Sequence, residues 1–254
     1  MKHPYLPQIL SIAKKAQLQK LLPSTMSDFP LHQAARENKP LTVEGILAEN
    51  PKLAISKDDD SRTPLHWACS MNNEQIVLII LPFVKVDIDE LTDDSGWTPL
   101  HIAASIGNQT IVDQLMATKP TPDVDLATNN GTTAIHLATS KNHYDLVQKL
   151  IDTYKSSVRV KDKKGITPLH RAAAIGSQPL VKMLVAAKAN VNAKDSDGWT
   201  PLHHALAEGY ADVGALLVLL GADVDAESNL GEKAANVACN EGVRKFFLQQ
   251  VGQV

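Results

Sequence analysis

Thr63-Pro64-Leu65-His66 decides the fold, because the same four residues return along the chain at a nearly constant interval. Perfect copies also begin at Thr98, Thr167 and Thr200, and relaxed copies occupy 29–32 and 133–136. The six histidines are 33 to 35 residues apart and stand at positions 32, 66, 101, 136, 170 and 203. A repeat of this period predicts an array of stacked units, each of which buries its apolar side against its neighbours.

Each copy of the motif also predicts how a helix begins and ends. Thr is a favoured N-cap, because its hydroxyl accepts a hydrogen bond from a free backbone N–H of the first turn. Pro suits the next position, where its missing N–H has no partner to lose. We expect Leu to face the core and the His ring to bond neighbouring backbone, tying one unit to the next. The helix then ends at an Asn or Gly in every copy: Asn38, Asn72, Gly107, Asn142, Gly176 and Gly209.

The remainder of each unit predicts a second helix and a turn. Residues 111–116 and 180–185 have the apolar spacing of amphipathic helices. An Asp-x-x-Gly turn follows at 93–96, 162–165 and 195–198, where Gly permits a positive φ.

This organisation resembles the ankyrin repeat, whose Thr-Pro-Leu-His-x-Ala pattern and period of about 33 residues match. The resemblance implies an all-α solenoid of seven helix-turn-helix repeats with β-hairpin fingers and a concave binding face. The expected repeat domain covers 26–254, and its repeats are 26–57, 58–92, 93–127, 128–161, 162–194, 195–227 and 228–254. The seventh has lost Thr, Pro and His. Residues 1–25 are expected to be a basic extension, disordered or forming a short helix.

The net charge of −3 conceals an uneven distribution. Residues 1–25 contain four Lys and no acidic residue, so the remaining residues carry −7. The small total argues against a nucleic-acid partner, since such domains usually carry a clear basic excess. The longest apolar run, Ile76–Leu81, is too short to span a membrane. Two cysteines cannot form a disulfide framework or a metal cluster, which fits a reducing compartment.

Catalytic chemistry has little support in the sequence. Six of the nine histidines stand in the repeat register, about one repeat apart, too far to share one metal ion. Neither a Gly-x-Ser-x-Gly nucleophile elbow nor a Gly-rich phosphate loop occurs. We therefore expect no enzyme, no metal and no cofactor.

Charged and aromatic residues mark the candidate partner-binding surface. Acidic residues crowd two early fingers at Asp58–Asp60 and Asp87–Asp94, whereas basic residues gather in the middle repeats. Solvated turns explain one Asp per finger, since Asp favours turns, but not three or five. Trp67 is expected to face a partner, and Trp97 either does the same or packs the fingers together. The candidate residues are Asp60, Arg62, Trp67, Asp93, Asp94, Trp97, Lys141 and Arg171.

Residues outside the generic repeat pattern are similar to the gankyrin family and its fungal members. They lie in Ser61–Ser70, Asp93–Ser105, Ser140–Asn142, His170–Ala174 and Lys245–Leu248. This resemblance implies a non-ATPase subunit and assembly chaperone of the 26S proteasome regulatory particle. Its concave face would clasp the C-terminal domain of the third base ATPase and block premature docking to the core particle. The matching contact positions are Asp60, Asp94, Arg62 and Lys141.

The same resemblance implies a protein of the cytoplasm and nucleus that is monomeric outside the complex and binds neither nucleic acid nor membrane. The alternative is a different ankyrin adaptor, such as an inhibitor of a kinase or of a transcription factor.

Overall fold

The computed structural model describes residues 29–252, so the expected extension at 1–25 lies outside the described residues. The described chain forms two compact units. Unit 1 contains residues 29–103 and 110–122, and unit 2 contains residues 104–109 and 123–252.

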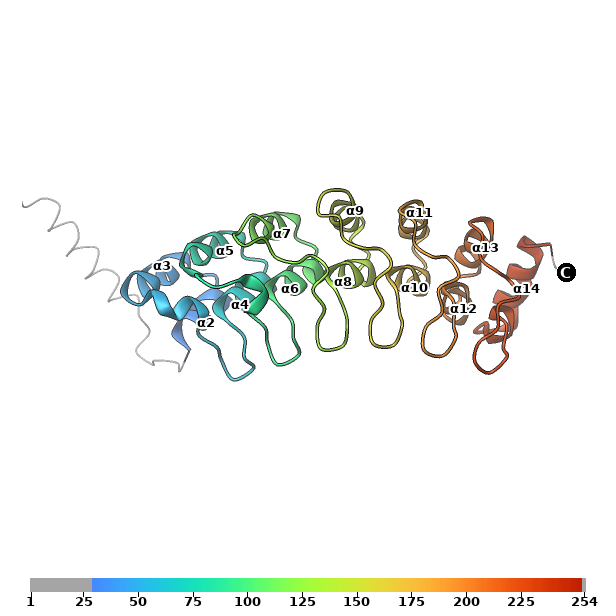
Figure 1. Cartoon of the computed structure of the whole chain (residues 1–254), viewed down its shortest axis with the longest axis horizontal. Helices are drawn as coiled ribbons and strands as arrows, with labels where there is room; N and C mark the ends of the chain where they lie inside the picture. Colours follow the sequence, from blue (N-terminus) through green and yellow to red (C-terminus); the bar gives the residue numbers. More distant parts are fainter. Residues whose placement is uncertain (1–28, 253–254) are drawn as a thin grey trace, which may run out of the picture. The chain divides into compact units, whose positions relative to one another are not determined.

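Unit 1 pairs short helices in two rows (Figure 1). Helices α2 and α4 pack side by side, as do α3 and α5, and each helix also packs on its partner within the repeat. Leu31, Leu47, Leu65, Ile76 and Ile80 are fully buried between the rows. The elements are α2 (Pro30–Arg36), α3 (Pro40–Glu49), η1 (Pro51–Ile55), α4 (Pro64–Ser70), α5 (Glu74–Ile80), η2 (Leu81–Phe83), η3 (Ile88–Glu90), and most of α6 (Pro99–Ile106) and α7 (Gln109–Met116).

Unit 2 repeats the arrangement. Helices α8, α10 and α12 form one row, and α9, α11 and α13 form the second row. Helix α14 packs on α13, and Phe247 of α14 is buried. The elements are α8 (Ala134–Ser140), α9 (Tyr144–Asp152), α10 (Pro168–Ala174), α11 (Gln178–Ala186), α12 (Pro201–Ala207), α13 (Ala211–Leu219), η4 (Ala234–Val237) and α14 (Glu241–Gln250).

The motif histidine closes a capping box at the start of α4, α8, α10 and α12. In α4 the Thr63 side chain caps the backbone of His66, as the sequence predicts. In return, the backbone N–H of Thr63 donates to Nδ1 of His66 at 3.0 Å, and the Thr63 hydroxyl lies 2.9 Å from the same nitrogen. Because a backbone N–H can only donate, Nδ1 carries no proton and the ring proton resides on Nε2. The same box closes α8, α10 and α12.

The Nε2 atom of each ring then links one repeat to the next. His66 donates to the carbonyl oxygen of Trp97 at 3.0 Å, and His170 donates to that of Trp199 at 3.1 Å. Burial lowers the pKa of His66, His136 and His170 to about 4. These rings are therefore neutral at pH 7, and the predicted role of the motif histidine in tying repeats together is confirmed.

The fingers are hairpin loops closed by backbone hydrogen bonds. Asp93 N donates to Trp97 O at 2.9 Å, and Asp195 N donates to Trp199 O at the same distance. Adjacent tips within a unit are also bonded, as where Ser196 N donates to Lys164 O at 2.8 Å. Within residues 29–252 the ladder pairing reduces to an isolated bridge between Glu227 and Lys233. The expected fingers are thus present, with hairpin turns rather than extended strands.

The last repeat is atypical, as its degraded motif predicts. Without Thr, Pro and His to cap it, the first helix of this repeat is the short 3-10 turn η4. The carbonyl oxygen of Glu232, which precedes η4 in this repeat, still accepts a hydrogen bond from His203 Nε2 at 3.0 Å. Gly214 on α13 leaves room for Phe247, because a Cβ there would lie 3.2 Å from the ring. Helix α14 thus covers the end of the core.

Candidate partner-binding surface

The predicted contact residues divide between the two units. Unit 1 contains Asp60, Arg62, Trp67, Asp93, Asp94 and Trp97, whereas unit 2 contains Lys141 and Arg171. Some of their charged side chains are exposed to solvent, whereas others form ion pairs or hydrogen bonds within the protein.

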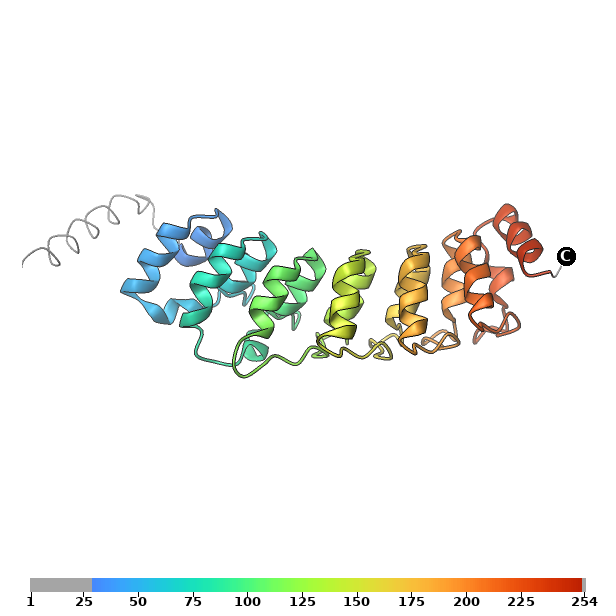
Figure 2. The same cartoon turned by 90° about the horizontal axis from the view of Figure 1, so that it is seen from above.

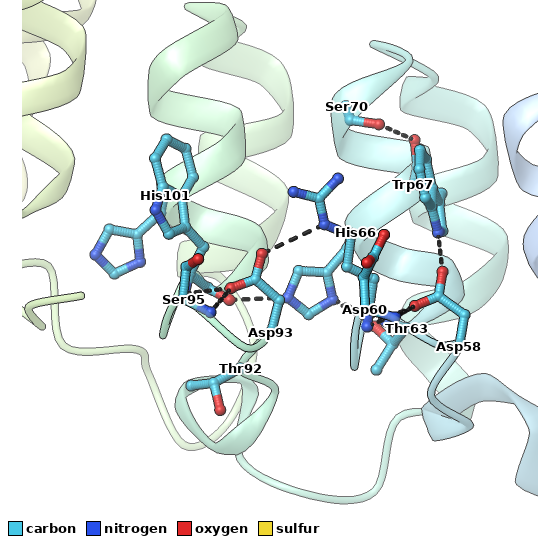
Figure 3. Close-up of polar contacts among 12 residues, drawn as sticks. Asp58, Asp60, Thr63, His66, Trp67, Ser70, Thr92, Asp93, Ser95 and His101 are labelled. Atoms are coloured by element: carbon cyan, nitrogen blue, oxygen red, sulfur yellow. Dashed lines mark hydrogen bonds and ion pairs between the residues drawn. The ribbon is translucent and has the colours of Figure 1, made fainter. Parts of the chain in front are cut away.

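Trp67 is held by neighbours on three sides. Its indole N–H donates to Oδ2 of Asp58 at 2.6 Å (Figure 3). The guanidinium carbons of Arg36 and Arg62 lie 4.5 and 5.3 Å from the indole ring centroid, within the range of cation–π attraction. The ring is half-buried and is held by one hydrogen bond and two guanidinium contacts, so only part of it is accessible to a partner.

Asp58 organises the first finger around this tryptophan. Its Oδ1 accepts from the backbone N–H of Asp60 and of Arg62, at 3.1 and 2.8 Å. Burial would raise the pKa of Asp58, but the hydrogen bonds from Trp67 and from the finger backbone outweigh it and hold the pKa below its usual value. The carboxylate is therefore charged at neutral pH.

Asp93 performs the same task in the next finger. Its Oδ1 accepts from the N–H groups of Ser95 and Trp97, both at 2.9 Å (Figure 3). Its Oδ2 lies 3.3 Å from Nε of Arg62, and the residue is only 8% exposed. Asp93 and Arg62 thus join two fingers, and the carboxylate of Asp93 faces away from solvent.

Asp60 and Asp94, in contrast, are exposed at the tips of these fingers. Their backbones are joined, since Asp94 N donates to Asp60 O at 3.3 Å. Asp59 is also exposed beside them. These three residues form an exposed acidic ridge on unit 1.

In unit 2 the two predicted basic residues differ in the same way. Arg171 is half-buried and donates to Asp162 Oδ2 at 2.9 Å and to Ser140 Oγ at 3.0 Å. Lys141 is exposed and directly follows α8. Lys141 therefore has the more accessible charge.

The sequence interpretation missed a recurring side-chain contact within the repeats. The first Asp of a finger accepts a hydrogen bond from the residue nine positions later, directly after the motif His. These pairs are Asp58–Trp67, Asp162–Arg171 and Asp195–His204, the last at 2.8 Å. Nine residues after Asp93 stands Ile102, whose side chain cannot donate. Asp93 instead accepts a hydrogen bond from Arg62 of the preceding finger. In the sequence, the constant spacing of nine residues between the finger Asp and a donor side chain could have predicted this contact.

The tryptophans that follow the finger Gly lie against histidines. Trp97 is 6.3 Å from His101 between ring centroids, and Trp199 is 5.9 Å from His203 and 5.4 Å from His204. The rings are half-buried. This geometry favours the packing interpretation of Trp97, and its contact with a partner stays a prediction.

Within the described residues, 29–252, no group of three or more His, Cys, Asp or Glu could hold a metal ion. Over the same range, no helix combines the length and the apolar character needed to cross a membrane.

Comparison with known proteins agrees with this architecture. Residues 9–90, 78–162 and 140–228 match the family model described as "Ankyrin repeats (3 copies)". The crystal structure of the ankyrin repeat domain of Bcl-3 superposes with a TM-score of 0.72 at 25% identity and covers 87% of this chain and 99% of its own. The fold is therefore an ankyrin-repeat solenoid, as predicted.

Two curated sequences refine this assignment. The "Probable 26S proteasome regulatory subunit p28" of Saccharomyces cerevisiae is 46% identical over 229 residues, which is 89% of this chain and 100% of the yeast protein. An ankyrin repeat-containing protein of Schizosaccharomyces pombe is 40% identical over 61 residues, 24% of this chain and 26% of that protein. The chain belongs to the family of the 26S proteasome regulatory subunit p28, the gankyrin family.

Proposed function

We propose that this chain is a non-enzymatic, protein-binding assembly chaperone of the 26S proteasome regulatory particle. The observation that carries the proposal is the 46% identity to the yeast p28 subunit, which extends over the whole yeast protein. Such identity exceeds what the repeat motif requires, since Bcl-3 has the same fold at 25%.

The proposed partner is the C-terminal domain of the third base ATPase. The acidic ridge of Asp59, Asp60 and Asp94 on unit 1 would meet basic residues of that domain, and Lys141 on unit 2 would meet its carboxylates. Complementary charges of both signs steer a partner and determine its orientation more than they raise affinity. Arg62, Asp93 and Arg171 would support this surface, because they are bonded within the protein.

The mechanism requires binding alone. While bound, the solenoid would cover part of the ATPase domain and block premature docking of the base on the core particle. The proposed protein is a monomer outside this complex and acts in the cytoplasm and nucleus. The second candidate function is that of an ankyrin adaptor inhibiting a kinase or a transcription factor. The shared fold favours it, since the Bcl-3 structure is described as a member of the IkappaB protein family.

Binding to the isolated ATPase C-terminal domain across a salt series tests the proposal. We expect salt-sensitive binding that weakens in the double variant Asp60→Lys, Asp94→Lys. A matched control, Glu44→Lys with Glu49→Lys, changes the charge of unit 1 equally at exposed positions on α3 and should bind normally. Equal binding by both variants would exclude the acidic ridge as the interface.

Affinity purification from cells separates the two functions. Recovery of free base subunits without complete proteasome supports the chaperone. Recovery of a kinase or a transcription factor without base subunits would refute it.

A further inference from the structure

We propose that a basic groove on unit 2 binds an acidic peptide segment of a partner protein. The groove has a volume of about 710 Å³ and is lined by the segments that follow α9 and α11. These two segments lie side by side in both views (Figures 1 and 2). Arg159, Lys161, Lys188 and Lys194 line it, together with Asn190 and Asn192.

The four cations are exposed, and three of them are anchored by backbone carbonyls alone. Arg159 Nε donates to Lys188 O at 2.8 Å, and Lys161 Nζ donates to Lys194 O at 2.9 Å. Lys194 Nζ donates to Glu227 O at 2.8 Å. These bonds orient the side chains and leave further N–H donors on each one, since an ammonium has three and a guanidinium five.

The carboxylates next to the groove lysines in the sequence are engaged elsewhere. Asp162 and Asp195 directly follow Lys161 and Lys194, but they accept from Arg171 and His204. Asp125, in the repeat before the groove, accepts from the hydroxyl of Ser156 and the backbone of Ser157. None of the four groove cations has an ion pair among residues 29–252, so the groove carries uncompensated positive charge.

The arrangement of the cations favours a chain with several carboxylates. Their anchors are three different carbonyl groups, of Lys188, Lys194 and Glu227, in two successive repeats, so the charges are spread along the groove rather than gathered around one anion. The Asn192 side chain already bonds Gly221 O and Asp223 N, and Asn190 Oδ1 accepts from Asn192 N. The Nδ2 group of the exposed Asn190 offers donors to a peptide backbone. The spread cations and this amide together match an extended acidic peptide in both charge and backbone hydrogen bonding.

The groove is separate from the surface of the proposed function. Its walls are connecting segments that follow the second-row helices, whereas Lys141 follows α8 and Arg171 lies on α10. If the chain does not bind the proposed ATPase, the groove is still present and can still bind an acidic peptide. The peptide experiment and the ATPase experiment therefore test the two proposals separately.

The test uses the full-length protein and a fluorescently labelled peptide of about 12 residues that alternates Glu and Ser. We expect salt-sensitive binding by fluorescence polarisation, weakened about tenfold by the double variant Arg159→Glu, Lys188→Glu. The matched control Lys52→Glu with Lys182→Glu alters the net charge equally at exposed positions outside the groove and should stay within about twofold of the native protein. Neutral Arg159→Gln with Lys188→Gln should lie between them, and circular dichroism verifies folding.

Four results would overturn the proposal. The peptide could fail to bind, or it could bind the groove and control variants equally. Inorganic polyphosphate could bind the groove while the peptide does not, which would assign the charge to another ligand. Finally, salt-sensitive self-association that the groove variant abolishes would assign the groove to a second copy of the chain.

Discussion

Arg62 and Asp93 join two successive fingers through one side-chain contact, in which Nε of Arg62 lies 3.3 Å from Oδ2 of Asp93. The other carboxylate oxygen of Asp93 meanwhile accepts two backbone N–H groups of its own finger. One buried carboxylate therefore shapes a turn and couples it to its neighbour. This distinguishes Asp93 from the exposed Asp60, although both occur in acidic stretches of the sequence.

Replacing Asp93 should reduce stability far more than replacing Asp60. Asp93→Ala removes an ion pair and leaves two finger N–H groups without their acceptor, so we expect a loss of about 2 kcal/mol in the free energy of unfolding. Asp60→Ala removes an exposed carboxylate and should change it by no more than about 0.5 kcal/mol. Urea denaturation of both variants checks this, and equal losses would contradict the structural role of Asp93.

Trp67→Phe should cost about 1 kcal/mol of stability, because it keeps an aromatic ring but removes the indole donor to Asp58. Trp97→Phe is the control, since no indole bond of Trp97 is present within residues 29–252, and it should be nearly neutral. The pKa of Asp58 should also rise in the Trp67 variant, because the indole bond helps to hold it low. An NMR titration measures that shift, and an unchanged Asp58 pKa would argue against the bond.

Ser61→Gly should stabilise the protein. Ser61 has φ of 59° at the finger position where Gly96, Gly165 and Gly198 have values of 75° to 78°. A left-handed conformation costs a residue with a Cβ about 1 kcal/mol, so relieving it should raise the unfolding free energy by up to that amount.

Gly165→Ala provides the opposite case for the same finger position. Its Cβ would lie 2.9 Å from the Asp195 backbone, so this variant should lose more than about 1 kcal/mol. Thermal unfolding of both variants tests the pair, and a destabilised Ser61→Gly would contradict the strain argument.

Stability should decline as the pH falls from about 6.5 to 4. Burial lowers the pKa of His66, His136 and His170 to about 4 in the folded protein. Between pH 6.5 and 4 these side chains therefore bind protons in the unfolded chain but stay largely neutral in the folded protein. The stability they contribute is therefore complete above pH 6.5 and is lost progressively below it.

Each such histidine should add about 1.4 kcal/mol per pH unit to the slope. The free energy of unfolding from denaturant curves at several pH values measures this slope. A flat profile between pH 6.5 and 4.5 would show that these rings bind protons equally well in the folded and unfolded chain.

The sequence predicted the parts of the fold that depend on local chemistry. Thr and Pro begin helices through their own backbone and hydroxyl, and Asn38, Asn72 and Asn142 end helices with φ between 52° and 59°. The return bond from the N–H of Thr63 to the ring of His66 was not foreseen, because the motif specifies the residues but not which ring nitrogen accepts.

The candidate surface was predictable only in part. Composition indicated acidic early fingers, and Asp60 and Asp94 are indeed exposed there. It could not separate them from Asp93, whose burial depends on the position of Arg62 in the folded chain. Likewise, the sequence predicted Arg171 as a partner contact, whereas in the folded chain its guanidinium donates to Asp162 and Ser140. Side chains that are bonded within the protein cannot be distinguished from exposed ones by sequence position.

The histidine links run in one direction, from each helix start to the following finger, and they end at Glu232. The turn η4 after that point offers no ring to continue them. In a repeat array, stability is the sum of intrinsic repeat terms and contacts between neighbours. The carboxyl-terminal repeat should therefore open locally before the others, so its amide protons should exchange with solvent deuterium while those of α10 and α12 are still protected.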